Sequence, residues 1–128
     1  MTPKKVLISG ASIAGPTLAF WLNRFGFEVT IVERAESLRL GGQNVDIKGA
    51  AQKIAQWMGI EEEIRAADTG ELGVRFVDEN DVIKAALPKG ESNLGTSELE
   101  ILRGDLVKIL YKHTKDNVEY LFGNQIIA

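Results

Sequence analysis

The sequence contains no cysteine among its 128 residues, and it has a single histidine, His113. Without cysteine the chain can form neither a disulfide nor a cysteine-based zinc site, and one histidine does not make a histidine-rich metal centre. We therefore expect no metal ligands. The lack of cysteine also fits a reducing, cytoplasmic location, which it permits without requiring it.

The chain also lacks an excess of positive charge and a long uninterrupted apolar run. Its 15 Lys and Arg against 18 Asp and Glu give a net charge of −3, so we expect no nucleic-acid partner, which would need a basic face. The apolar stretch after Lys4 and Lys5 has the length of an export signal. However, Gly10, Gly15 and Pro16 interrupt it and no cleavage pattern follows, so we expect no membrane partner either.

What is present is the composition of one ordinary globular domain, with 45% apolar and 26% charged residues. A β-α-β unit is predicted at its start. The run Val6–Ile8 is short and continuously apolar, as in a strand buried on both faces. Apolar residues then recur at helical spacing over residues 14–25, and Gly26 marks the end of this helix. A second apolar run, residues 29–32, predicts another strand, which ends at Glu33.

The loop between the first strand and the helix reads GASIAG, which is G-x-G-x-x-G with serine in place of the second glycine. Gly10 permits the tight turn, Ser12 is small enough for the backbone to approach a pyrophosphate, and Gly15 lets helix and strand pack closely. The helix N-terminus offers unpaired N–H groups to phosphates. Glu33, at the end of the second strand, can accept hydrogen bonds from a ribose. This combination predicts a dinucleotide-binding loop.

Two other enzyme classes can be read into the sequence. Ser12 lies in an approximate G-x-S-x-G hydrolase elbow, but this would need a histidine base and only His113 exists. Tyr111 and Lys115 form the Y-x-x-x-K pair of short-chain dehydrogenases, although the glycine spacing of their loop is not matched. An NAD(P)-binding dehydrogenase module therefore stays an alternative, as does a nucleotide-binding fragment without catalysis.

The middle of the chain predicts helices and a hairpin. A helix is expected from about Gly49 to Met58, with Trp57 and Met58 in the core, and the acidic run after Ile60 predicts the first turn of another helix. Two strands around the polar turn Asp78–Asp81 predict a hairpin appended to the parallel sheet. The glycine- and serine-containing segment Pro88–Ser97 is expected to be a loop.

The C-terminal third predicts a short strand around Ile101 and then an amphipathic helix over residues 104–114. Leu106, Ile109 and Leu110 form the apolar face of this helix. Residues 118–122 predict a strand, and residues 125–128 predict the start of one more.

Three blocks of the sequence resemble a known family: GASIAGPTLAFWLNRFGFEVTIVERA, GGQNVDIKG and LEILRGDLVKIL. They are similar to the N-terminal portion of the class A FAD-dependent monooxygenases, the para-hydroxybenzoate hydroxylase-like enzymes, and most similar to the tetracycline-inactivating branch. Glu33-Arg34 and Arg103-x-x-Leu106 are more specific to this family than the glycine loop. The resemblance implies an α/β fold with a Rossmann-like FAD-binding β-α-β sheet and an appended β-hairpin, incomplete relative to the full family fold.

The resemblance also implies which residues bind the cofactor FAD: Gly10, Ser12, Ile13, Ala14, Gly15, Glu33, Arg34, Asp46 and Arg103. The loop would hold the pyrophosphate, Glu33 the ribose and Arg34 the adenine end, while Arg103 would reach the phosphates or the ribityl chain. Asp46 would lie near the flavin, although its spacing after the preceding glycines departs by one residue from the family pattern. Arg34, Asp46 and Arg103 also fit plain surface or turn roles.

The activity that the resemblance implies is oxygenation of a small organic substrate, aromatic or polyketide-like, with NAD(P)H and dioxygen. Because the cofactor carries this chemistry, we expect no catalytic side chain within the chain. The later cofactor motifs and the substrate domain of the family do not occur in residues 1–128. We therefore expect an N-terminal part of an FAD-binding domain, inactive alone, with an open sheet edge available for self-association.

Overall fold

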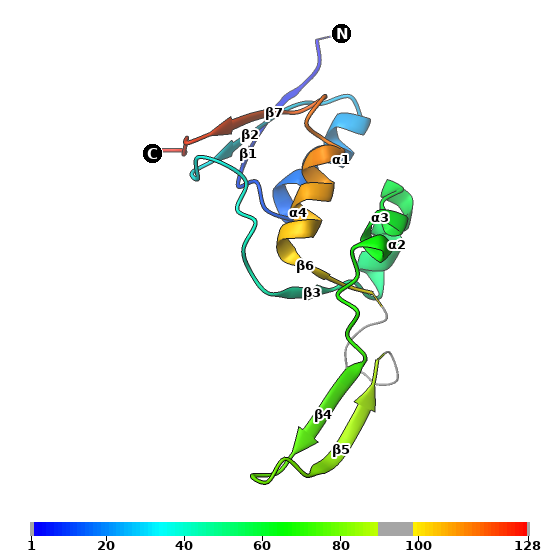
Figure 1. Ribbon diagram of the computed structural model, residues 1–128. Coiled ribbons are helices and arrows are strands. Elements are labelled where there is room, and N and C mark those ends of the chain that lie inside the picture. Colours follow the sequence, from blue (N-terminus) through cyan, green and yellow to red (C-terminus); the bar gives the residue numbers. More distant parts are fainter. Residues whose placement is uncertain (1, 90–98, 128) are drawn as a thin grey trace. The chain divides into compact units, whose positions relative to one another are not determined.

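The computed structural model describes residues 2–89 and 99–127 and divides into two units (Figure 1). One unit comprises Met1–Gly41 and Gly104–Ala128, and the other comprises Gly42–Arg103. Most of the loop expected over Pro88–Ser97 lies outside the described residues.

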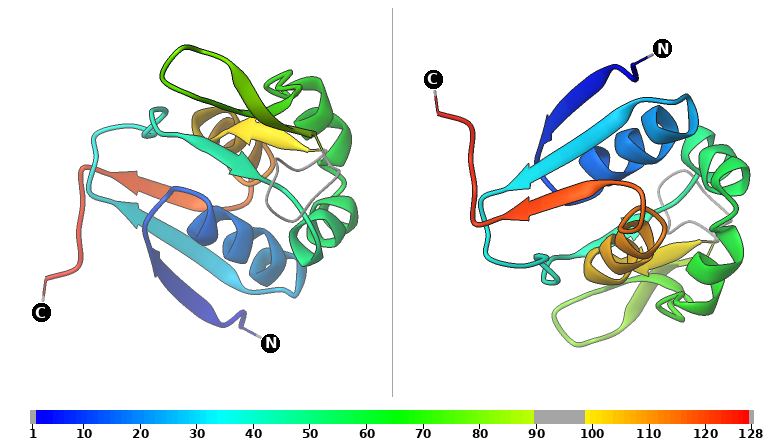
Figure 2. Two further views of the ribbon diagram at one scale, coloured as in Figure 1. Left: turned by 90° about the horizontal axis from the view of Figure 1, so that it is seen from below. Right: turned by 90° about the horizontal axis from the view of Figure 1, so that it is seen from above.

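The first unit is built on a parallel sheet in the order β1-β2-β7. Helix α1 connects β1 to β2, and helix α4 precedes β7; Figure 2 shows the three strands side by side. The bounds are β1 (Lys5–Ser9), α1 (Ala14–Arg24), β2 (Glu28–Glu33), α4 (Arg103–Lys112) and β7 (Glu119–Phe122). The strand–helix–strand order predicted for residues 6–33 is therefore present, and its two strands are parallel.

Alternation along the strands gives this sheet one core face. Ile8 of β1 and Val29 and Ile31 of β2 are buried on it, and α1 covers them with Ala19. Aromatic side chains of β7 extend the same face, where the ring of Tyr120 packs edge to face against Tyr111 of α4, with ring centroids 4.9 Å apart. Burying these apolar side chains is what holds the helices on the sheet.

The second helix of this unit, α4, shows the apolar face that its sequence predicts. Leu106, Ile109 and Leu110 are all buried. At its start, Gly104 packs so closely against the carbonyl group of Leu40 that a Cβ atom there would overlap with it. Glycine at this position therefore allows the helix to approach the segment that follows β2.

The second unit combines an antiparallel strand pair, two short helices and a hairpin. Strand β3 pairs with β6, and the hairpin strands β4 and β5 pair with each other. The bounds are β3 (Asn44–Asp46), α2 (Ala50–Met58), α3 (Glu61–Ala66), β4 (Gly73–Val77), β5 (Ile83–Pro88) and β6 (Glu100–Leu102). Ile64 and Ile101 are fully buried in this unit.

Four predictions were wrong. Strand β1 is not buried on both faces, because Leu7 is 56% exposed. The hairpin forms its own two-stranded sheet and shares no ladder with the parallel sheet. Trp57 is 67% exposed rather than in the core, whereas Met58 is buried as predicted. Residues 125–127 form no strand. Within the part of the chain that the structure describes, no helix has both the length and the apolar character needed to cross a bilayer.

Candidate functional site

The glycine loop after β1 has the geometry that its glycines predict. Gly10 has φ +105°, a conformation that side-chain-bearing residues rarely adopt, and its N–H donates to the carbonyl oxygen of Val32 at 2.8 Å. A Cβ atom at Gly15 would overlap with the carbonyl oxygen of Gly10. Gly10 therefore allows the turn, and Gly15 lets α1 start directly against the end of β1.

The N-terminus of α1 follows the loop without a side-chain cap. The residue before the helix, Ile13, makes no capping hydrogen bond through its side chain, and the first turn contains no acidic residue. The first amides of a helix have no intrahelical partner, so the N–H groups of Ala14 and Gly15 point out of the helix end. The positive end of the helix dipole is thus open to an anion.

Glu33 lies at the end of β2 and reaches into this loop. Its Oε2 accepts a hydrogen bond from the N–H of Ala11 at 2.9 Å, and its Oε1 accepts one from the N–H of Ala35, also at 2.9 Å. Two backbone amides therefore fix the carboxylate. Because a carboxylate has about four lone-pair directions, roughly two remain for hydroxyl groups of a ligand.

The same contacts keep Glu33 ionised. The amide of Ala35 first, and the amide of Ala11 next, lower the pKa of Glu33, while partial burial opposes them and the charges of Arg39 and Arg34 assist. An ionised carboxylate only accepts hydrogen bonds, which matches a pair of ribose hydroxyls that donate them.

Arg34 follows directly on Glu33 and is exposed. The backbone on either side of it is braced by the end of β7, because Gly123 donates to the carbonyl oxygen of Ala35 at 2.9 Å and Asn124 donates to that of Glu33 at 3.1 Å. Arg34 therefore extends from a well-anchored strand end next to the carboxylate.

The structure places seven of the nine predicted residues in one unit and two in the other. Asp46 and Arg103 belong to Gly42–Arg103, whereas the loop residues, Glu33 and Arg34 belong to the first unit. Asp46 is exposed on β3. Arg103 is half-buried, and a Cβ atom at Gly42 would overlap with its Nε. The stem of Arg103 thus lies along the backbone of Gly42, which has φ +122°.

The structure does not support the hydrolase and short-chain dehydrogenase alternatives. His113 lines a small hollow with Asn23 and Arg24 at the C-terminal end of α1, whereas Ser12 precedes its N-terminal end. A helix of 11 residues is roughly 16 Å long at about 1.5 Å per residue, so His113 cannot act as a base for Ser12. Tyr111 packs its ring against aromatic side chains of β7 rather than facing an open site.

Sequence reasoning missed two contributors to the site, the backbone amides of Ala11 and Ala35. Their side chains carry no chemistry, so composition gives no signal. Their positions do give one: each lies directly beside a predicted site residue, in the glycine loop and after Glu33, where a backbone N–H can face the carboxylate.

Comparison with known proteins gives a consistent result. No family model matches the chain. It is 49% identical over 132 residues to the flavin-dependent monooxygenase eupH of Phoma sp, an alignment that covers 98% of this chain and 31% of that protein. It is 38% identical to the FAD-dependent monooxygenase asL4 of Sarocladium schorii over 98% of this chain and 30% of that protein. The chain therefore spans about a third of the length of these relatives.

Solved structures agree. The crystal structure of the tetracycline destructase Tet(55) matches with a TM-score of 0.82 and 38% identity, covering 98% of this chain and 31% of that one. The crystal structure of CtdE in complex with FAD matches with a TM-score of 0.80 at 21% identity, which shows a shared fold. Along nearly its whole length the chain is therefore homologous to the flavin-dependent monooxygenases, and the expected resemblance to this family is confirmed.

Proposed function

We propose that the chain is the FAD-binding portion of a flavin-dependent monooxygenase, with residues 1–128 forming an N-terminal part of a Rossmann-like FAD-binding domain. The glycine loop and the start of α1 hold the pyrophosphate, Glu33 holds the adenosine ribose, and Arg34 lies at the adenine end. Relatives named flavin-dependent monooxygenases and a neighbour solved with FAD support this proposal.

The observation that carries the proposal is the position of Glu33. Its carboxylate is hydrogen-bonded to Ala11 inside the glycine loop, and is therefore next to the helix start where a phosphate would bind. In dinucleotide-binding folds the pyrophosphate lies at a helix N-terminus and an acidic residue accepts hydrogen bonds from the ribose. The loop and the end of β2 supply both.

Two amides of the glycine loop already donate hydrogen bonds within the protein, so they do not donate to a phosphate. The N–H of Gly10 is taken by Val32 and that of Ala11 by Glu33. The pyrophosphate would therefore rely on the amides that follow, at the uncapped start of α1, where Ala14 and Gly15 contribute. The residues present thus fit an anionic dinucleotide.

The remaining parts of the proposal concern the whole protein. Bound FAD would supply the redox chemistry, with NAD(P)H and dioxygen as co-substrates and a small organic molecule as substrate. By the same family resemblance, Asp46 and Arg103 are proposed as further cofactor-binding residues. Strand β1 has a partner on one side only among the described strands, which supports the proposed self-association through this edge.

Titration of the purified chain with FAD, followed by flavin fluorescence, tests the proposal. We expect Glu33→Ala to weaken binding by about 1–3 kcal/mol, which is roughly 5- to 150-fold, because ribose hydroxyls lose their acceptor. Glu28→Ala is the matched control, since Glu28 begins the same strand and is exposed. It should leave the affinity unchanged.

Equal FAD affinity of Glu33→Ala and the unmodified chain would contradict the assignment of Glu33. If the chain binds NADH but not FAD, the dehydrogenase alternative replaces the proposal. Circular dichroism of both variants shows whether a loss of binding reflects the site or the fold, because Glu33 also braces Ala11 and Ala35.

A further inference from the structure

The turn that follows β7 is hydrogen-bonded to the segment that carries Glu33. The last register pair between the two strands is Glu33 opposite Phe122. Beyond this pair, the N–H of Asn124 donates to the carbonyl oxygen of Glu33 at 3.1 Å. The N–H of Gly123 donates to the carbonyl oxygen of Ala35 at 2.9 Å. The turn therefore holds both ends of the segment from Glu33 to Ala35.

Ala35 connects this turn with the carboxylate of Glu33. Its N–H donates to Oε1 of Glu33 at 2.9 Å, while its carbonyl oxygen accepts from Gly123. Ala35 is thus bonded on both sides, to the carboxylate and to the turn. The direction of its N–H is set by the end of β7 as well as by β2 itself.

The turn depends on glycine because of its backbone conformation. Gly123 has φ +67°, in the left-handed region that β-branched residues rarely adopt. A Cβ atom there would meet only the far end of the Glu36 side chain, with Oε2 at 3.3 Å, so space is not the main constraint. The conformation of Gly123 sets where the N–H of Asn124 points. Nδ2 of Asn124 also donates to the carbonyl oxygen of Phe122 at 2.8 Å, which closes the turn.

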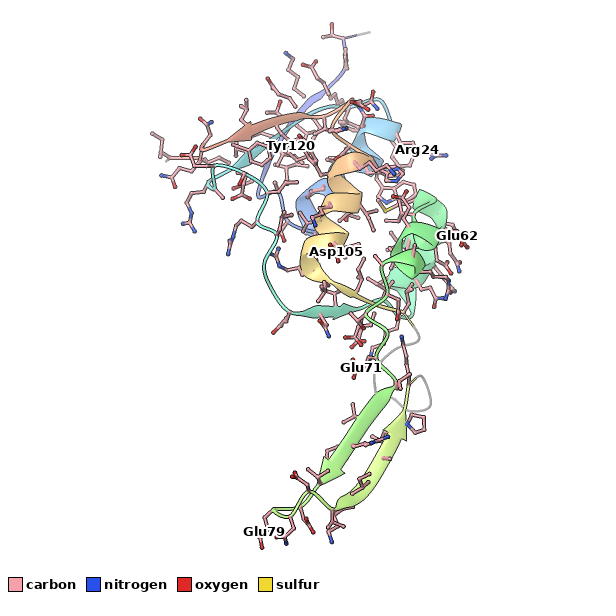
Figure 3. The ribbon with its side chains drawn as sticks, viewed as in Figure 1. Arg24, Glu62, Glu71, Glu79, Asp105 and Tyr120 are labelled. Atoms are coloured by element: carbon pink, nitrogen blue, oxygen red, sulfur yellow. The ribbon has the colours of Figure 1, made fainter. Side chains whose placement is uncertain are left out.

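Aromatic packing anchors the strand from which the turn extends. The rings of Phe122 and Tyr120, the latter labelled in Figure 3, are stacked with centroids 5.9 Å apart. Both rings pack edge to face against Tyr111 of α4. The end of β7 is therefore a firm support for the turn.

We propose that Gly123 and Asn124 are positioning residues for Glu33: their turn holds the Ala35 amide against the carboxylate and so sets the direction in which Glu33 faces a ribose. The identity of the ligand rests on the proposed function. The positioning itself is a property of the free chain, so it can be measured without any ligand.

The titration of Glu33 in the free chain, followed by carbon-13 NMR of its carboxyl carbon, reads out this positioning. The amide of Ala35 is the largest cause that lowers the pKa of Glu33, and the amide of Ala11 comes next. Partial burial opposes them, and the charges of Arg39 and Arg34 assist. A turn that no longer holds Ala35 should therefore raise the midpoint toward the ordinary value of 4.5.

Gly123→Val is the variant that should open the turn, because a β-branched residue disfavours φ +67°. We expect its Glu33 midpoint to rise. Gly123→Asn should keep the midpoint of the unmodified chain, because asparagine tolerates the left-handed region.

Gly26→Val is the matched control for backbone strain. Gly26 also has a positive φ, +84°, and a Cβ atom there meets nothing within 4 Å. It lies between α1 and β2, at the opposite end of the strand from Glu33. We expect Gly26→Val to lower the free energy of unfolding while the Glu33 midpoint stays unchanged.

FAD titration of the same variants connects the positioning with binding. Gly123→Val should bind FAD roughly fivefold more weakly, as expected for one hydrogen bond loosened, whereas Gly123→Asn and Gly26→Val should bind as the unmodified chain does. An unchanged Glu33 midpoint in Gly123→Val, or an equal rise in Gly26→Val, would overturn the positioning. A raised midpoint with unchanged FAD affinity would support the positioning and contradict the assignment of Glu33 under the proposed function. If Gly123→Val does not fold, Gly123→Ala and Gly26→Ala give the same comparison with milder strain.

Discussion

Replacement of Gly15 by alanine tests the close contact between β1 and α1. The new Cβ atom would overlap with the carbonyl oxygen of Gly10 and would lie 3.3 Å from Cγ2 of Ile8. Gly10 cannot simply withdraw, because its N–H is hydrogen-bonded to Val32 of β2. The start of the helix must therefore move away from the strand.

The magnitude follows from two opposing effects. Overpacking against rigid backbone costs about 1–3 kcal/mol, and a direct overlap belongs at the upper end of this range. Alanine is favoured over glycine inside a helix by up to about 1 kcal/mol. We therefore expect Gly15→Ala to lower the free energy of unfolding by about 2 kcal/mol and to weaken FAD binding, because the amides of α1 move with the helix.

Urea unfolding followed by tryptophan fluorescence measures this effect. In a Trp57→Phe background Trp21 is the one remaining tryptophan, and it lies on α1 beside Phe20. Gly41→Ala is the control, since a Cβ atom at Gly41 meets nothing within 4 Å, and we expect it to be neutral or slightly stabilising. An unfolding free energy for Gly15→Ala equal to that of Gly41→Ala, with full FAD binding, would refute the reasoning.

Two further predictions concern stability. The ion pair with Lys89 lowers the pKa of Asp68 to about 2, so the stability that this pair contributes is present above pH 3.8 and is lost as pH falls toward 2. Lys89→Met should therefore reduce the fall in unfolding free energy between pH 3.8 and 2. An unchanged fall would contradict the pairing. The hydroxyl groups of Thr114 and Tyr120 lie 2.6 Å apart. Thr114→Val should therefore lower the free energy of unfolding by about 1–3 kcal/mol, because it leaves the partly buried Tyr120 hydroxyl without this partner. A double-mutant cycle with Tyr120→Phe that shows no coupling would contradict this bond.

The sequence predicted best those elements whose pattern is set locally. The apolar run Val6–Ile8, the glycines on both sides of α1 and the polar turn at Asp78 each determine their own structure over a few residues. All three occur in the structure within one or two residues of their expected bounds. The sequence also predicted that Glu33 lies at the end of a strand. It could not predict which amides donate to its Oε1 and Oε2.

Elements that depend on distant partners were not predictable. Strand β3 is three residues long and polar, so no periodicity marks it; it exists because β6 pairs with it across more than 50 residues of chain, with Asn44 opposite Leu102. Alternation in Leu99-Glu100-Ile101 suggests that Glu100 faces solvent, yet it is buried and accepts a hydrogen bond from Asn44. The alternation of a strand predicts on which face of the sheet a side chain lies, but it does not predict which residues cover that face.

The hydrogen bond between Glu33 and Ala11 connects folding with binding. Because amides of the chain itself, those of Ala11 and Ala35, hold the carboxylate, it does not have to be ordered by a ribose, which lowers the entropic cost of binding. The same bond removes Ala11 from the set of free amides, so an anion meets the helix start rather than the turn. A loop that depended on ligand to position its acid would need the opposite arrangement, with a mobile carboxylate and an open turn. The geometry of Glu33 therefore favours a site that is formed in advance.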